Sequence, residues 1–163
     1  MKLARDARAF LGMVGPQGAL LGVDPGTETI GIAISDERRT LASPLETIAR
    51  SKLAVDLERM GVLVRERGAV GIVLGMPYNM DGTAGRRAQS VRAFSRSIEE
   101  ALDLPVLHWD ERLSTVAADE AMMETERDRT ARATRIDAVA AASILQGALG
   151  VFTGIAAQER LAK

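Results

Sequence analysis

The stretch ALLGVDPGTETIGIAIS, residues 19–35, contains two apolar runs separated by a turn. The first run, Ala19 to Val23, is long enough for one buried strand, and the turn sequence Asp24-Pro25-Gly26 follows it. From Thr29 to Ser35, isoleucines alternate with small residues. This period of two predicts a strand with one large-residue face and one small-residue face. The two runs therefore predict a β-hairpin whose first strand ends in an aspartate.

Beyond the hairpin, patterns of strand and helix type alternate, which indicates an α/β layer structure. A third, edge strand carrying a proline is expected at Leu41–Ile48. Two later strands are apolar runs, Ala69–Leu74 and Val106–Asp110. A hairpin extended by crossover helices gives a mixed five-stranded sheet flanked by helices. In such a sheet, one strand lies between the strand that ends at Asp24 and the strand that ends at Asp110. The ends of these two strands are then about 9.5 Å apart.

The expected helices follow the 3.6-residue period. The first runs from Lys52 to about Arg67, with Ser51 as its N-cap and Leu53, Leu57, Met60 and Val64 on one face. The others are expected at about Ala84–Leu102, from Ser114 or Thr115 to Met123, and at Ile136–Leu149. The charged segment Thr125–Arg135 is expected to connect the last two helices.

Composition excludes several classes of protein. A length of 163 residues corresponds to one domain at roughly 150 residues per domain. We divide the chain into an N-terminal extension (1–18), a central domain (19–150) and a C-terminal tail (151–163). The net charge of −1 excludes a strongly basic DNA-coating protein, so any nucleic acid must bind to a local patch. Without cysteine there is no disulfide framework or thiolate site, and a cytoplasmic protein with no membrane partner is expected.

Acidic residues lie where separate elements end or begin. Asp24 ends the first strand, Asp110 and Glu111 end the last strand, and Asp137 lies in the first turn of the final helix. Ligands of open α/β sheets bind at the carboxyl ends of parallel strands. Each acid taken alone also fits a turn, a solvated pair or a helix-dipole contact. Together they fit the needs of Mg²⁺, which binds a few carboxylates and keeps substrate phosphate as a further ligand.

Other polar residues give weaker signals. The arginines that follow the loop at 78–82 fit either a solvated helix face or a clamp on a phosphate backbone: Arg86, Arg87, Arg92 and Arg96. His108, the only histidine, lies in an apolar strand and is expected to be a hydrogen-bonded core or rim residue. Aromatic residues make up only 3% of the chain, so it has little material for a stacking platform.

Several motifs in order from about Leu20 to Leu149 resemble the YqgF/RuvX family of Holliday-junction resolvases and pre-rRNA nucleases. They are GVDPGT (22–27) with IGIAISD (30–36), SPLETI (43–48), LGMPYNMDG (74–82), DERLST (110–115) and IDAVAA (136–141) with ILQ (144–146). The resemblance implies an RNase H-like fold and a metal-dependent nuclease. Its catalytic carboxylates map to Asp24, Glu111 and Asp137, which also hold Mg²⁺ or Mn²⁺, with Asp110 as a possible fourth ligand.

The resemblance also implies partners and a substrate. The Asn79 loop and Arg112 would shape the site or contact phosphate, and Arg86, Arg92 and Arg135 are further candidates for substrate binding. The expected function is processing of the 5′ end of pre-16S rRNA, in contact with the small ribosomal subunit, by a monomer or homodimer. Alternatives are a four-way-junction resolvase, a non-catalytic RNA- or ribosome-binding module, and an actin-like ATPase, which would need a second lobe.

Two departures from the family pattern remove positive charge near the substrate. Glu28-Thr29 stands where members usually carry a basic residue. The segment 130–135, TARATR, replaces a run that is richer in lysine and arginine. These departures bear on affinity and substrate preference more than on the carboxylates.

Overall fold

A mixed five-stranded sheet forms the centre of the computed structural model, which describes residues 2–113 and 129–162. The strand order is β3-β2-β1-β4-β5. The strands are β1 (Ala19–Pro25), β2 (Thr29–Ser35), β3 (Ala42–Ala49), β4 (Ala69–Met76) and β5 (Val106–Asp110). β1 pairs antiparallel with β2 and parallel with β4, and β4 pairs parallel with β5. The expected mixed sheet is confirmed, with one strand between Asp24 and Asp110.

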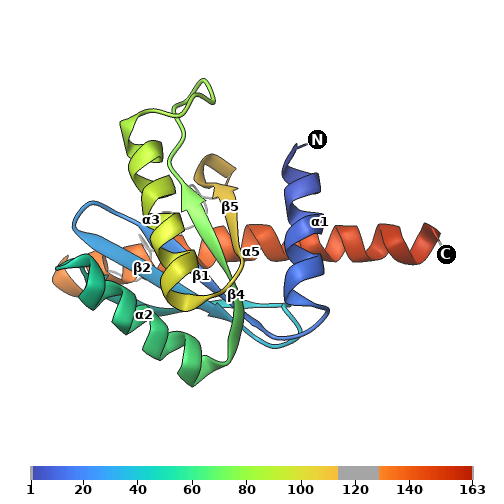
Figure 1. Cartoon of the computed structure of the whole chain (residues 1–163), viewed down its shortest axis with the longest axis horizontal. Coiled ribbons are helices and arrows are strands. Elements are labelled where there is room, and N and C mark those ends of the chain that lie inside the picture. The colour runs from blue at the N-terminus through green and yellow to red at the C-terminus, as the bar shows by residue number, and fades with distance from the viewer. Residues whose placement is uncertain (1, 114–128, 163) are drawn as a thin grey trace.

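Helices cover both faces of the sheet (Figure 1). They are α1 (Lys2–Val14), α2 (Leu53–Arg67), α3 (Arg86–Leu102) and α5 (Arg129–Ala162), with a short 3₁₀ turn, η1 (Glu111–Leu113), after β5. Ile30 and Ile32 of β2 pack into the core under α2 and α3. Ala33 packs into the opposite core, under α5 and α1. The face of large residues and the face of small residues predicted for 29–35 thus pack against different layers of helices.

Small residues on the sheet let α5 approach the strands closely. A Cβ at Gly31 would lie 2.0 Å from the Asp137 carbonyl oxygen of α5. A Cβ at Gly22 would lie 2.8 Å from Leu145 Cβ, and one at Gly75 would lie 2.7 Å from Ile144 Cδ1. These three glycines belong to the adjacent strands β2, β1 and β4. The close approach fixes the height of α5, and so of Asp137, above the sheet.

The two ends of the chain pack together. Phe10 of α1 stacks on Phe152 of α5, with ring centroids 5.9 Å apart, and Ile155 joins the same core. Figure 1 shows α1 lying across the C-terminal half of α5. Among the described helices, Ile136–Ala162 of α5 is long and apolar enough to cross a membrane by composition alone. Half of its most apolar stretch is buried inside the protein, as expected for a core helix.

The structure corrects the expected start of the first sheet-covering helix. α2 begins at Leu53, and its N-cap is Lys52 without a side-chain bond. Ser51 instead donates its N–H and hydroxyl to the buried Asp56 carboxylate. Leu53 is 46% exposed, so it does not share the buried face of Met60. The carboxylate of Asp56, rather than the Ser51 side chain, therefore organises this helix start.

The structure also corrects the bounds of the final helix, which were expected at Ile136 and Leu149. α5 begins at Arg129. The alanines and arginines of 129–135 have high helix propensity, which favours a helix over the expected connecting segment. It continues past Gly150 to Ala162, because burial of Phe152 and Ile155 against α1 stabilises the extra turns. The helix expected from Ser114 or Thr115 to Met123 lies outside the described residues.

Candidate active site

Asp24 and Glu111 meet at the carboxyl edge of the sheet. Asp24 is next to last in β1, and Glu111 begins η1 directly after β5. The strand between them, β4, has a glycine at this edge: a Cβ on Gly75 would lie 3.4 Å from Glu111 Oε2. The missing side chain therefore leaves room for Glu111 to reach across β4. A side-chain hydrogen bond between the two carboxyl groups favours the protonated form of Asp24 and the charged form of Glu111.

The surroundings disfavour negative charge on both carboxyl groups. Burial, the nearby carboxylate of Glu111 and that of Asp137 raise the pKa of Asp24 to about 7. Burial also raises the pKa of Glu111. The Arg87 guanidinium acts in the opposite sense on both groups. A desolvated acid pair that retains a proton is a site that a cation would stabilise, because a cation can replace the shared proton.

Asp137 approaches the pair from α5. Its Oδ2 accepts a hydrogen bond of 2.6 Å from the Thr29 hydroxyl of β2. The backbone of Asp137 lies directly over Gly31, where a side chain would collide with it. At the departure Glu28-Thr29, the neutral hydroxyl of Thr29 thus bonds to this carboxylate. Asp137 acts electrostatically on Asp24 but is held by its own partner.

Sequence reasoning considered Arg87 only for a solvated helix face or a phosphate clamp and did not predict its place beside the acid pair. Its side chain donates a hydrogen bond to the Pro25 carbonyl, next to Asp24. The periodicity of α3 contains the signal: Arg87 lies four residues before the buried Val91 and seven before the buried Phe94. Arg87 therefore lies on the inward face of the helix. It is the basic residue of α3 whose charge reaches both acids of the pair.

The donor set fits a hard divalent cation in chemistry but is not a formed cage. Asp24 and Glu111 supply adjacent carboxylate oxygens, which Mg²⁺ and Mn²⁺ prefer, and Asp137 is near enough to affect the Asp24 proton. Within residues 6–113 and 136–162, no three His, Asp or Glu side chains already stand at metal-binding distances. Two of the three predicted acids are thus in contact, and the third bonds to Thr29.

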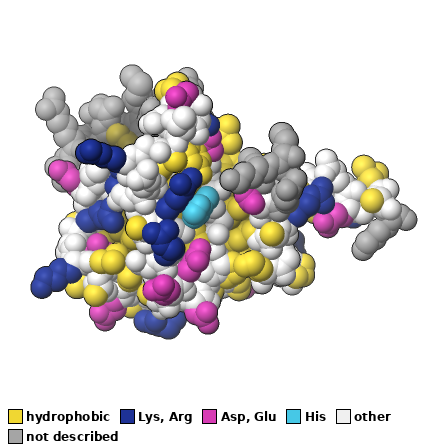
Figure 2. Space-filling model, turned by 45° about the horizontal axis from the view of Figure 1, so that its top comes forward, with side chains coloured by type: hydrophobic (Ala, Val, Ile, Leu, Met, Phe, Trp, Pro, Cys, Tyr) yellow, Lys and Arg dark blue, Asp and Glu magenta, His cyan; other side chains and the backbone are white. Residues whose placement is uncertain are grey.

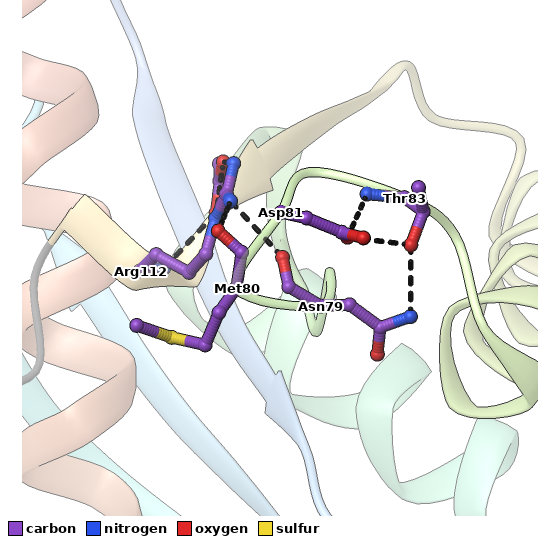
Figure 3. A network of polar contacts seen from close by, with 6 residues as sticks. Asn79, Met80, Asp81, Thr83 and Arg112 are labelled. Atoms are coloured by element: carbon purple, nitrogen blue, oxygen red, sulfur yellow. Dashed lines mark hydrogen bonds and ion pairs between the residues drawn. The ribbon is translucent and has the colours of Figure 1, made fainter.

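Arg112 forms a brace between Asp110, which directly precedes Glu111, and the loop that carries Asn79 and Met80. Figure 3 shows Arg112 beside this loop. Arg112 Nε donates to Asp110 Oδ1 over 2.9 Å, and this guanidinium holds the pKa of the Asp110 carboxyl below its usual range. Arg112 Nη1 also donates to the carbonyls of Asn79 and Met80, at 3.0 and 3.1 Å. The Asn79 side chain bonds to Thr83 within the loop. The structure thus places Asp110, Arg112 and Asn79 in loop support.

The other predicted basic residues are spread apart. Arg86 is exposed at the first turn of α3. Arg92 lines a cavity of about 760 Å³ together with His108, Arg112 and Asp110. Figure 2 shows Lys and Arg side chains gathered beside the single histidine. His108 is half-buried and hydrogen-bonded to Ser95 Oγ at 2.8 Å, as expected for a rim residue. Arg135 belongs to α5, but its side chain lies outside the described set.

We expect Asp24→Asn to stabilise the metal-free protein above neutral pH. The folded protein releases the Asp24 proton at a pKa of about 7, whereas the ordinary value is 3.8. Wild-type stability therefore falls as pH rises between these values, and the asparagine variant lacks that loss. The gain at pH 8 is at most on the order of 4 kcal/mol.

Thermal unfolding in EDTA, at pH 5 and pH 8, measures this effect. The variant should gain more over wild type at pH 8 than at pH 5. Added Mg²⁺ should then raise the midpoint of wild type but not of Asp24→Asn. A difference between the two proteins that does not change with pH would contradict the assignment of the raised pKa to Asp24.

Comparison with solved structures identifies the fold. The chain is similar to RuvC of T. thermophilus in complex with a Holliday junction substrate, with a TM-score of 0.56 and 16% sequence identity. The alignment covers 83% of this chain and 96% of RuvC. A second T. thermophilus RuvC structure gives a TM-score of 0.53 at 12% identity. At these identities the likeness establishes the RNase H-like fold alone.

Sequence relatives establish the class. A Cereibacter sphaeroides protein is 54% identical over 140 residues, covering 86% of this chain and 88% of that protein. A Roseobacter denitrificans protein is 46% identical over 159 residues, covering 96% and 98%. Both carry the name "Putative pre-16S rRNA nuclease". Fold, acid pair and relatives together define a nuclease, a hydrolase of phosphodiester bonds in nucleic acid.

The profile of the RuvX family, described as Holliday junction resolvase, matches residues 18–150. The chain belongs to the RuvX family.

Proposed function

We propose that this protein is a divalent-metal-dependent nuclease that processes the 5′ end of pre-16S rRNA. The observation that carries the proposal is the half-buried, hydrogen-bonded pair of Asp24 and Glu111 at the end of the sheet. Such a pair has little use as a stabilising contact, because burial and mutual repulsion oppose ionisation of both groups. The choice of rRNA is supported by the names of relatives that match most of this chain.

Asp24 and Glu111 are the proposed first ligands of the cation, and Asp137 completes the acidic set. When bound, Mg²⁺ or Mn²⁺ supplies an activated water and stabilises the leaving oxygen of an in-line displacement. Thr29 orients the Asp137 carboxylate through its 2.6 Å hydrogen bond. The positive charge of Arg87 partly offsets the negative charge of the pair. No side chain is assigned the role of general base.

The proposed nucleic-acid surface extends from the acid pair over the start of α3. Arg86 is exposed there, and Arg92 lies in the cavity next to His108. With a net charge of −1, the chain depends on such local arginines for phosphate contacts. Asp110 and Arg112 support the loop at 79–82 in this proposal rather than binding substrate directly. A cytoplasmic location and contact with the small ribosomal subunit follow from the proposed substrate.

Cleavage of two substrates tests the proposal. A precursor 16S rRNA 5′-leader fragment and a four-way DNA junction are incubated with the protein in Mg²⁺, Mn²⁺ or EDTA. We expect cleavage of the RNA in either metal and none in EDTA. RNA binding without cleavage in any metal would contradict the nuclease and indicate a binding module.

Resolution of four-way DNA junctions is the second candidate, because the matching family profile carries that description. A resolvase must cut two strands symmetrically, which requires a dimer of this chain. Paired nicks in the DNA junction, with intact RNA, would favour this candidate. The mass of the complex in solution would then be expected to correspond to two copies of the protein.

A further inference from the structure

Met80 lies in the loop between β4 and α3 and is 91% exposed. A single exposed apolar side chain is common on protein surfaces and by itself indicates nothing. The loop around Met80, however, is closed by its own backbone. Asn79 N–H donates to the Thr83 carbonyl at 2.9 Å, and Gly82 N–H donates to the Asn79 carbonyl at 2.8 Å. Gly82 adopts a φ of +87°, which the tight turn requires.

Side chains reinforce this loop. Asp81 Oδ1 accepts the Thr83 N–H at 3.0 Å and the Thr83 hydroxyl at 2.7 Å. The Asn79 amide donates to the same hydroxyl at 3.0 Å. Figure 3 shows these bonds on one side of the loop, while the Met80 side chain extends away from them. The backbone carrying Met80 is therefore ordered before any partner arrives.

Arg112 ties the loop to the proposed active site. It donates hydrogen bonds to the Met80 carbonyl and to the carboxylate of Asp110, the residue directly before Glu111. Met80 thus stands at a fixed place relative to the acid pair. Leu113, which directly follows Arg112, is also exposed, but less so than Met80. Met13 and Leu161 lie on the terminal helices α1 and α5, away from this brace.

Four of the five aromatic residues of the chain are buried, and the fifth, Tyr78, lines the cavity beside Gly82 and Arg112. The chain has three Phe, one Trp and one Tyr. Phe10, Phe94, Phe152 and Trp109 are buried, and Tyr78 is half-buried against the core. Methionine is unbranched and polarisable, so it fits between or against ring faces. Methionine is also among the apolar side chains that nucleic-acid-binding proteins insert between base steps.

From this geometry we propose that Met80 inserts against a base of the bound nucleic acid and unstacks the step beside the scissile phosphate. The proposal rests on the proposed function, because it needs a nucleic-acid substrate at the acid pair. It assigns Met80 a positioning role. The rigid loop supplies a fixed wedge, and the displaced base bends the strand toward Asp24 and Glu111.

Fluorescence of 2-aminopurine tests this role without cleavage. The Asp24→Asn protein is mixed with the leader RNA or the DNA junction, with 2-aminopurine placed at successive positions around the site cut by wild type. If wild type cuts neither substrate, the positions flank the junction point or the mature 5′ end. We expect fluorescence to rise at one step on binding, and Met80→Ala in the same background to abolish that rise while binding persists. In the otherwise wild-type protein, Met80→Ala should lower kcat/KM on the order of tenfold, as for loss of one stacking contact.

Two matched variants complete the test. Met80→Leu should keep most of the fluorescence rise because it keeps an apolar side chain of similar size. Met13→Ala, on the exposed face of α1, should leave both fluorescence and cleavage unchanged. An equal rise with Met80→Ala would overturn the wedge while leaving the nuclease intact. Failure of the Asp24→Asn protein to bind either nucleic acid would instead overturn the proposed function.

Discussion

Asp24→Asn and Glu111→Gln should each lower the rate of phosphodiester cleavage by on the order of a thousandfold or more. Each substitution removes one carboxylate charge from a pair that would share a cation, while the size of the side chain stays the same. The fold should persist, because burial already disfavours the charged forms of the two groups, which are hydrogen-bonded to each other. Initial rates on the 5′-leader RNA in saturating Mg²⁺ measure the effect, with circular dichroism to confirm folding.

Asp103→Asn provides the matched control for these two substitutions. Asp103 is an exposed residue at the C-cap of α3, in the left-handed conformation that asparagine also tolerates. The same chemical change should leave cleavage unaltered there. Full activity in either active-site variant, or an equal loss in Asp103→Asn, would remove the basis for assigning catalysis to the pair.

Gly31→Ala should destabilise the protein by about 3 kcal/mol and abolish cleavage. The new Cβ would lie 2.0 Å from the Asp137 carbonyl oxygen and 2.5 Å from its carbonyl carbon. Both atoms belong to a helix backbone, so no rotamer change can relieve the collision. α5 must move off the sheet, and Asp137 must move with it, away from Asp24 and Thr29. Urea unfolding and the cleavage assay measure the two effects.

Gly154→Ala is the control within the same helix. An added Cβ at Gly154 meets no atom within 4 Å, and the residue is exposed. Alanine favours helix over glycine by up to about 1 kcal/mol, so this variant should be as stable as wild type or slightly more stable. If Gly31→Ala unfolds at the same urea concentration as wild type, the packing of α5 on the sheet does not depend on the absence of a side chain at Gly31 of β2.

Local patterns were sufficient to predict much of the fold. The alternation of residues 29–35 predicted the two faces of β2, which pack against different helical layers. The turn after Val23 placed Asp24 at a strand end, and the order of elements predicted a single strand between it and Asp110. These features follow from periods of two and 3.6 residues, which depend only on neighbours along the chain.

Side-chain partners were harder to predict, because they join elements distant in sequence. Arg112 was expected to shape the site or contact phosphate, but its bonds to Asp110 and the loop carbonyls could not be assigned from the sequence. Ser51 was expected to cap α2, but Asp56 takes its donors. Arg87 lay on the inward face by its periodicity, yet only the packed position of α3 brings it near the acid pair. Each outcome depends on which of several acceptors lies within reach after packing.

Patterns along the chain were enough to predict the class of fold, the family motifs and the acids at the ends of separate elements. Packing between distant segments brings the Asp24 and Glu111 carboxyl groups together, joins Thr29 to Asp137, and ties Arg112 to the Met80 loop. The physical reason is one of distance. A periodic pattern specifies which face a side chain occupies. Contact between the Asp24 and Glu111 carboxyl groups across β4, by contrast, depends on the bare backbone of Gly75 between them, and the position of Asp137 depends on that of Gly31 beneath α5.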